Sequence, residues 1–333
     1  MKMLKPLAVL LLLVSVLTEA RAGAAVFLGE PYGGISRFSP TGHVAVYLDR
    51  VCAASPTELR RCAPGELGVV ISRYNKVGGY DWIAIPLMPY LYAVERAQDV
   101  PALVDAQVVA ELREAYRRRY LREIVPDHPR RPSPKGDWVQ LIGAAYDRKI
   151  YAFEVATREE QDDAFILAFN ARKNKRRFNP LFRNCADFAK DVINFYHPKS
   201  VRRSVIADAG LTTPKQVAKS LVRYSQKHPE VELSGYVIPQ VNGSMPRSKS
   251  VRGVLEALVK TKKYAVPLAL VHVWVGPGLL AGYLTTGRFN PSKYAATEFD
   301  PAALEQRALG QSLSVSVAQL PLRLPPRMPS GLQ

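Results

Sequence analysis

The stretch NPLFRNCADFAKDVINFY, from Asn179 to Tyr196, decides the predicted fold, because it combines an amphipathic helical pattern with a cysteine at its start. Asn184 is a preferred helix cap and a candidate oxyanion-site residue, and Cys185 then falls in the first turn of the predicted helix. Unpaired N–H groups there lower the pKa of a thiol and can hold an oxyanion, whereas the nearby Asp187 carboxylate raises that pKa. Cys185 is therefore a core residue, half of a disulfide or a nucleophile.

The N-terminal segment indicates where the protein resides. Lys2 and Lys5 precede an apolar run from Leu7 to Leu17, and Ala20-Arg21-Ala22 forms a small-x-small cleavage site. This is the organisation of a secretory signal peptide. The run is shorter than the ~20 residues of a bilayer span, so an uncleaved anchor is the less favoured alternative. We expect residues 1–22 to be removed and the protein to be periplasmic or extracellular, with membrane association left open.

Export changes the interpretation of the three cysteines. Paired cysteines tend to form bridges in an oxidising compartment. Cys52 and Cys62 flank the short polar segment CAASPTELRRC, and we predict a disulfide between them. Cys185 then has no partner, and it is either a small buried apolar residue or a reactive thiol.

Charge indicates the kind of partner. The net charge is +17, and residues 1–22 contribute three of the basic residues and one of the acidic ones, so the mature chain keeps about +15. Outside the cytosol such a charge attracts an anionic membrane surface or cell-wall polymer, and we expect no nucleic-acid partner. Basic residues cluster at 117–119 and 172–177, where a solvated helix face is the alternative explanation. The oligomeric state remains open.

Patterning along the chain predicts an α+β protein, with 47% hydrophobic residues available for a core. Short apolar or β-branched segments predict strands, and segments with helical periodicity predict helices. The predicted strands are 43–48, 66–72, 81–87, 138–147 and 150–157, and the predicted helices are 101–124, 158–174, 185–196, 212–228 and 250–263. We predict a catalytic domain at 23–198, a helical and apolar extension at 199–289, and a disordered Pro/Ala/Ser-rich tail at 290–333.

The segment from Tyr264 to Gly287 carries no charge and is long enough to span a membrane. Pro267, Pro277 and His272 lie within it, and Gly276–Gly278 would form a turn. We favour a broken hairpin, buried or apposed to a membrane, over a true span.

A nucleophilic cysteine needs a base, which is usually a histidine. His43 follows Gly42 and opens the strand HVAVYL, so sheet hydrogen bonds would fix its position. The other four histidines lie beside prolines or within an apolar run, and we expect them to be structural: His128, His197, His228 and His272. The chain has no G-x-S-x-G, H-E-x-x-H or Walker motif.

A GHVAVYL strand followed far downstream by an NCADF helix resembles the circularly permuted papain-like proteins. These are relatives of the NlpC-type cell-wall peptidases, and they include the YiiX-like group and the lecithin:retinol acyltransferase group. The resemblance covers Phe27 to Tyr196. It implies that Cys185 is the nucleophile and His43 its base, with no metal or organic cofactor.

The superfamily usually has a third polar residue that orients the histidine. If 43–48 pairs antiparallel with 66–72, the start of the first strand lies opposite the end of the second, which favours Ser72 or Tyr74. Asp81 is a charged alternative. The expected function is an exported cysteine hydrolase or acyltransferase acting on an amide or ester bond of a cell-wall peptide or lipid-type substrate. The alternative is a non-catalytic envelope protein that uses the same fold to bind a membrane or wall.

Overall fold

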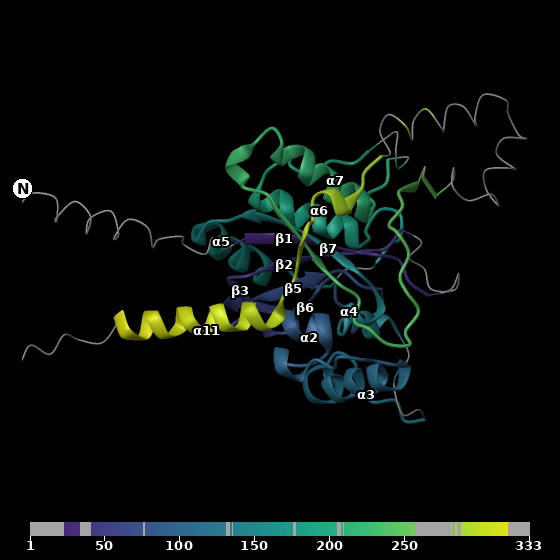
Figure 1. Cartoon of the computed structure of the whole chain (residues 1–333), viewed down its shortest axis with the longest axis vertical. Coiled ribbons are helices and arrows are strands. Elements are labelled where there is room, and N and C mark those ends of the chain that lie inside the picture. The colour runs from purple at the N-terminus through teal and green to yellow at the C-terminus, as the bar shows by residue number, and fades with distance from the viewer. Residues whose placement is uncertain are drawn as a thin grey trace, which may run out of the picture.

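A seven-stranded sheet forms the centre of the computed structural model and confirms the α+β class (Figure 1). The structure describes residues 23–318 except for 34–40, 76, 131–133, 135, 176–177, 205–207, 209, 255, 258–280, 282–283 and 285–287. The strand order is β6-β5-β2-β1-β7-β8-β9. Neighbouring strands are antiparallel, except for the parallel pair of β8 and β9.

The seven strands are β1 (Gly23–Gly29), β2 (His43–Leu48), β5 (Val69–Ser72), β6 (Ile83–Pro86), β7 (Ile150–Ala156), β8 (Ser234–Ile238) and β9 (Thr297–Glu298). A separate two-stranded ribbon consists of β3 (Val51–Ser55) and β4 (Glu58–Arg61). The predicted Cys52–Cys62 disulfide is confirmed and closes this ribbon. Of the predicted strands, 43–48 has the bounds that we expected, and three others are shorter.

The described helices are α2 (Leu87–Tyr92), α3 (Ala106–Tyr116), α4 (Ala144–Asp147), α5 (Glu159–Asn170), α6 (Cys185–Tyr196), α7 (Pro214–Ser225) and α11 (Pro301–Ala318). A π-helical turn at Arg117–Leu121 continues α3, and 3-10 turns lie at Ala97–Asp99, Asp137–Gln140, Pro229–Val231 and Pro291–Lys293. The predicted cap is confirmed for α7, where the Thr213 side chain accepts a hydrogen bond from Gln216 N.

Helices cover both faces of the sheet, because side chains along a strand point alternately to opposite faces. In β1, Ala24, Val26 and Leu28 pack into one core with α5, α6 and α7. Ala25 and Phe27 pack into the other core with α2, α3 and α4. Figure 1 shows the two helical layers on opposite sides of the strands. Because both faces of β1 are buried, every side chain along it is apolar and its sequence does not alternate with polar residues.

The predicted strand at 138–147 is wrong, because this segment forms the 3-10 turn Asp137–Gln140 and helix α4. Gly143 adopts a φ of +68° at the start of α4, which interrupts any extended conformation. Trp138 and Ile142 are buried in the core on the α2 side of the sheet. A short buried apolar segment has the same composition in either conformation, so its sequence pattern did not separate them.

The C-terminal part of the chain belongs to the same sheet, contrary to the predicted boundary after residue 198. Strand β8 pairs with β7 from Ile150–Ile238 to Glu154–Ser234, and α7 packs into the core beside α6. The prediction of a tail without regular structure is wrong for the described residues up to Ala318. There the Asp300 side chain caps α11 by accepting from Ala302 N and Ala303 N. Alanine and leucine supply helix propensity in α11 without strong amphipathic periodicity.

Several predictions fall on residues outside the described part of the chain. These are the signal peptide at 1–22, most of the apolar segment Tyr264–Gly287 with His272, and most of the predicted helix 250–263. Among the residues that were described, no helix is both long and apolar enough to cross a membrane.

Candidate functional site

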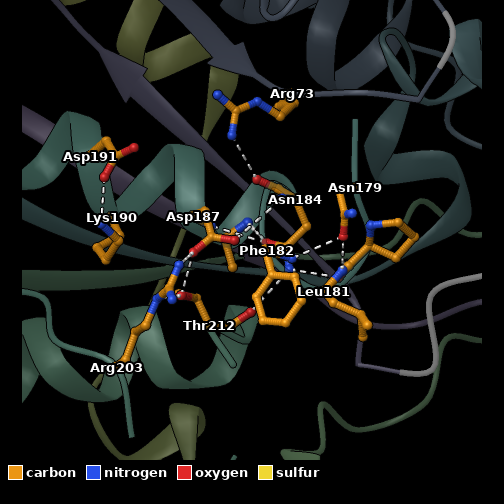
Figure 2. A network of polar contacts seen from close by, with 12 residues as sticks. Arg73, Asn179, Leu181, Phe182, Asn184, Asp187, Lys190, Asp191, Arg203 and Thr212 are labelled. Carbon is orange, nitrogen blue, oxygen red and sulfur yellow. Dashed lines mark hydrogen bonds and ion pairs between the residues drawn. The ribbon is translucent and has the colours of Figure 1, made fainter. Parts of the chain in front are cut away.

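Helix α6 begins at Cys185 and is capped by Asn184, as the sequence predicts (Figure 2). The Asn184 Oδ1 atom accepts hydrogen bonds from Ala186 N at 2.8 Å and from Asp187 N at 3.0 Å. This cap fixes Cys185 in the first turn, and the residue as a whole is partly buried. Cys185 is free of any disulfide, as expected.

The prediction that Asn184 contributes to an oxyanion site does not agree with its hydrogen bonds. Its Nδ2 group donates to Pro180 O at 2.9 Å and to Thr212 O at 3.3 Å, so its amide is engaged on both sides. The cap also accepts hydrogen bonds from the Ala186 and Asp187 N–H groups, which we expected to be unpaired. Asn184 is therefore a structural residue that positions the thiol.

Asp187 was expected to oppose thiol ionisation, and the structure directs its charge elsewhere. Its Oδ1 atom accepts from Arg203 Nη2 at 2.8 Å and from Thr212 Oγ1 at 2.6 Å (Figure 2). Arg203 therefore compensates the Asp187 charge. Asp187 is also part of the helix cap, because it forms the capping box with Asn184.

The thiol of Cys185, in helix α6, lies beside the first residues of strand β2. The backbone N–H of Val44, next to His43, is close enough to stabilise its thiolate, as are the N–H groups of Cys185 and Ala186. Burial nevertheless raises the pKa of the thiol, and these N–H groups and the Arg148 charge only partly offset that effect. The expectation of a lowered thiol pKa is therefore wrong, because desolvation outweighs the helix start.

His43 is buried and its ring is held by Ser72, at the end of β5. His43 Nε2 lies 3.1 Å from Ser72 Oγ, and the Ser72 hydroxyl donates to Val44 O at 2.8 Å. A hydroxyl has one hydrogen, so Ser72 Oγ must accept from Nε2–H. This arrangement leaves Nδ1 of the neutral ring as the nitrogen that can accept a proton.

The same geometry separates the three candidates for the orienting residue. Ser72 makes the hydrogen bond, and Tyr74 stacks on the His43 ring with centroids 5.0 Å apart. Asp81 instead pairs with Arg73 Nε at 2.8 Å and Nη2 at 2.9 Å. Asp81 therefore does not orient the histidine. Its partner Arg73 donates a hydrogen bond to the Asn184 carbonyl at 3.4 Å.

Consecutive residues at the end of β5 thus hold the two halves of the site. Ser72 contacts the ring of His43. Arg73 contacts Asn184, the residue before the cysteine (Figure 2). The two halves are also electrostatically connected. The Cys185 thiol lies within electrostatic range of Tyr74 and Tyr90, whose hydroxyls hydrogen-bond to each other.

Burial lowers the pKa of His43 to about 3, and the Arg148 charge lowers it further. The free protein therefore holds a neutral imidazole at His43 and a neutral thiol at Cys185, and not a preformed ion pair. A neutral imidazole is the form that acts as a general base.

No sequence pattern marked Arg148 or Tyr90, which both act electrostatically on the thiol. Arg148 follows an apolar segment that we had predicted to be a strand, and its sequence context resembles an ordinary surface turn. Tyr90 lies in α2, for which no helix was predicted. Only the three-dimensional packing brings them to the site.

The remaining histidines that the structure describes lie away from the thiol. His197 Nε2 contacts Ala156 O at 3.0 Å, His228 Nδ1 contacts Glu230 at 2.8 Å, and His128 Nδ1 accepts from Arg130 N. A cavity of about 340 Å³ between the ribbon, α2 and α11 is lined by Cys52 of the disulfide but by none of the predicted catalytic residues.

The basic clusters are less uniform than their sequences indicate. Arg117 is fully buried and pairs with Glu114 and Asp127 at 2.6 Å, so it is a core residue. Arg118 and Arg119 are well exposed. In the second cluster, the described Lys175 ammonium lies 3.8 Å above the Tyr80 ring.

Comparisons of the chain with protein-family models, with curated proteins and with solved structures find no match.

Proposed function

We propose that this protein is an exported cysteine hydrolase or acyltransferase with a permuted papain-like core. The observation that carries the proposal is the placement of Cys185 at the start of α6, beside the Val44 amide, with the adjacent His43 fixed by Ser72 as the Nε2–H tautomer. A nucleophile, a base and a group that orients the base are the parts that acyl transfer requires.

In the proposed reaction, the Cys185 sulfur attacks the carbonyl carbon of an amide or ester. His43 Nδ1 takes the thiol proton as the S–C bond forms and the carbonyl π pair moves onto oxygen. Collapse of the tetrahedral intermediate breaks the bond to the leaving group, which receives the proton from His43. Water or another acceptor then attacks the thioester, and the thiol is regenerated.

The neutral state of the pair shapes this mechanism. Because the thiol pKa is raised and the imidazole pKa is lowered, proton transfer accompanies the attack and does not precede it. The Cys185 N–H, in the first turn of α6, is the backbone donor that we assign to the developing oxyanion.

The proposed substrates are cell-wall peptides or lipid-type acyl groups at a membrane surface. Support comes from the charge of about +15 after removal of residues 1–22, from exposed basic residues such as Arg118 and Arg119, and from the disulfide. A disulfide is typical of an oxidising compartment, which agrees with the proposed export.

One observation favours a second candidate function. A thiol with a raised pKa is poorly nucleophilic at neutral pH, which suits a non-catalytic envelope protein that binds a wall or a membrane through its basic residues.

Turnover of a panel of cell-wall peptides and acyl esters separates the two candidates. Cys185→Ala and His43→Ala are each expected to abolish turnover, and the double variant should lose no more than either single variant, because the pair acts as a unit. A circular dichroism melt of each variant controls for folding. Turnover that survives both substitutions excludes the cysteine mechanism proposed for Cys185 and His43. Failure of the wild type to turn over any member of the panel favours the binding protein.

A further inference from the structure

Arg148, in the connection between α4 and β7, is a buried cation with unused hydrogen-bond donors. Arg148 is 4% exposed, and in the part of the chain that the structure describes its Nε and Nη1 atoms have no hydrogen-bond partner. Nη2 makes a long 3.4 Å contact with Gln140 Oε1, and the guanidinium lies 4.3 Å above the Tyr32 ring. Buried polar groups normally find partners, so these atoms point to a ligand that the described residues do not supply.

The other buried arginines in the described part of the chain make the contrast clear. Each forms an ion pair with a carboxylate: Arg73 with Asp81 at 2.8 Å, Arg113 with Asp147 at 2.6 Å, and Arg117 with Glu114 at 2.6 Å. Arg113 takes the carboxylate of Asp147, the residue next to Arg148. Among the described residues, Arg148 has no such partner within 4.0 Å.

Arg148 also lies beside the proposed catalytic pair. Its Cδ and Nη1 atoms are 2.7 and 3.4 Å from the point where a Cβ of Gly29 would be, and His43 O is 3.6 Å from the same point. Gly29 is the cross-strand partner of His43. Only glycine leaves room for the guanidinium there, and the Arg148 charge acts on both His43 and Cys185.

We propose that Arg148 binds a carboxylate of the substrate next to the bond that Cys185 attacks. This inference rests on the proposed function and adds a substrate class: an amide or ester with a free carboxylate close to its carbonyl, as in a peptide or an acylated amino acid. The unused N–H groups supply the charge-assisted hydrogen bonds that carboxylates accept. One buried cation neutralises one carboxylate, whereas a phosphate monoester would bring uncompensated charge into the site.

The test compares two alkylating reagents of nearly the same size on the full chain. Iodoacetate carries a carboxylate and iodoacetamide does not. The ratio of their rates at Cys185 cancels the thiolate fraction, because both reagents react with the same thiolate. We expect a ratio that exceeds that of glutathione by about tenfold or more, and that falls to the glutathione value in Arg148→Gln. Arg119→Gln, at an exposed position, is the matched control and should keep the wild-type ratio.

Competition identifies the anion. N-acetylglycine should slow the iodoacetate reaction, and neutral N-acetylglycinamide should not. A ratio that is unchanged in Arg148→Gln overturns the inference, and so does competition by dimethyl phosphate with none by N-acetylglycine. The inference and the proposed function fail separately, because the ratio does not depend on turnover. If His43→Ala leaves the thiol reactivity unchanged while the ratio still depends on Arg148, the proposed enzyme is rejected and the carboxylate site is retained.

A second, independent observation concerns the first residue of β1. Gly23 N donates a hydrogen bond to Asp49 Oδ2 at 2.9 Å, and Glu154 Cγ and Oε1 lie 2.7 Å from the point where a Cβ of residue 23 would be. Burial raises the pKa of Asp49 to about 7 and also raises the pKa of Glu154. One carboxylate thus accepts from the Gly23 nitrogen and a second lies beside the same residue, with the Arg50 charge as the cation that acts on Asp49.

We infer that Asp49 and Glu154 form a binding site for a new α-amino group at Gly23, which cleavage after Ala22 would create. This inference rests on the proposed signal-peptide processing. Cleavage converts the neutral amide that already contacts Asp49 into an ammonium, so an ion pair replaces a hydrogen bond without movement of the strand. Gly23 also suits this position because no larger side chain fits beside Glu154.

The full chain with its own leader, exported from a bacterial host, tests this inference. Intact mass should place the first residue at Gly23. Insertion of one alanine after Ala22 moves the ammonium one residue away, and we expect a melting temperature that is lower by several degrees. Asp49→Asn should remove the difference between the two chains. A different first residue, or equal melting temperatures for the normal and inserted chains, overturns the inference.

Discussion

At the scale of single residues, the central feature is the hydrogen bond between the His43 ring and Ser72, which decides the tautomer of the ring. The sequence narrowed the partner of the ring to Ser72, Tyr74 or Asp81, and the structure assigns the hydrogen bond to Ser72. Strand pairing made this possible, because Val46 opposite Ile71 places the end of β5 beside the start of β2. The sequence did not reveal that Asp81 pairs with Arg73, because that contact depends on how the loop after β5 folds back.

Ser72→Ala tests this orientation. Without the hydroxyl the ring loses the acceptor that holds Nε2–H, so Nδ1 is no longer fixed as the base. We expect kcat to fall by about tenfold or more with little change in KM, because a misplaced base affects the reacting atoms and not substrate binding. The assay is steady-state kinetics on the best substrate of the panel. An unchanged kcat in a variant with a normal melting temperature contradicts the orienting role.

The lowered pKa of His43 also predicts how stability depends on pH. The folded-state pKa is about 3 and the ordinary value is 6.5, so between these values the unfolded chain binds a proton at His43 that the folded chain does not. His43 therefore imposes no penalty above pH 6.5, and stability falls as the pH drops from 6.5 towards 3. Urea unfolding of wild type and His43→Gln should show a steeper acid loss in the wild type. Parallel curves contradict the lowered pKa.

At the scale of secondary-structure elements, the sequence predicted what local patterns determine. Helix α6 with its Asn184 cap and strand β2 appear where their periodicity placed them. Elements whose conformation depends on surrounding layers were missed. Strand β1 is buried on both faces, so its sequence lacks the alternation of apolar and polar residues that marks a strand. Residues 138–147 are apolar enough for a buried strand, but they form a 3-10 turn and helix α4.

The cap of α6 links its local sequence to the position of the thiol, and Asn184→Ala measures that link. Removing the side chain leaves the Ala186 and Asp187 N–H groups without their partner. We expect a loss of about 1 kcal/mol in the free energy of unfolding, measured with urea. Asn184→Ser is the control, because serine is an equally good cap and places no carboxylate oxygen against the Pro180 and Thr212 carbonyls, and it should retain most of the stability. A stable Asn184→Ala variant contradicts the assigned capping role.

At the scale of the whole molecule, one sheet unites segments that the sequence divided into domains. β1 lies between β2 and β7, β8 and β9 extend the sheet from the C-terminal part, and α7 completes the layer around α6. Such contacts join residues far apart in the chain, and single-sequence patterns do not specify them. The site shares this property, because Cys185, His43, Ser72 and Arg148 come from four separate segments.

The measurement that tests the central claim most directly is the rate at which iodoacetamide alkylates Cys185 in the full chain near neutral pH. If His43 accepts the thiol proton, His43→Ala should slow the reaction by about tenfold or more. His197→Ala, whose ring contacts Ala156 O instead of the thiol, should leave the rate at the wild-type value. Equal rates in wild type and His43→Ala would contradict the account, because they would show that the two residues do not act as a pair.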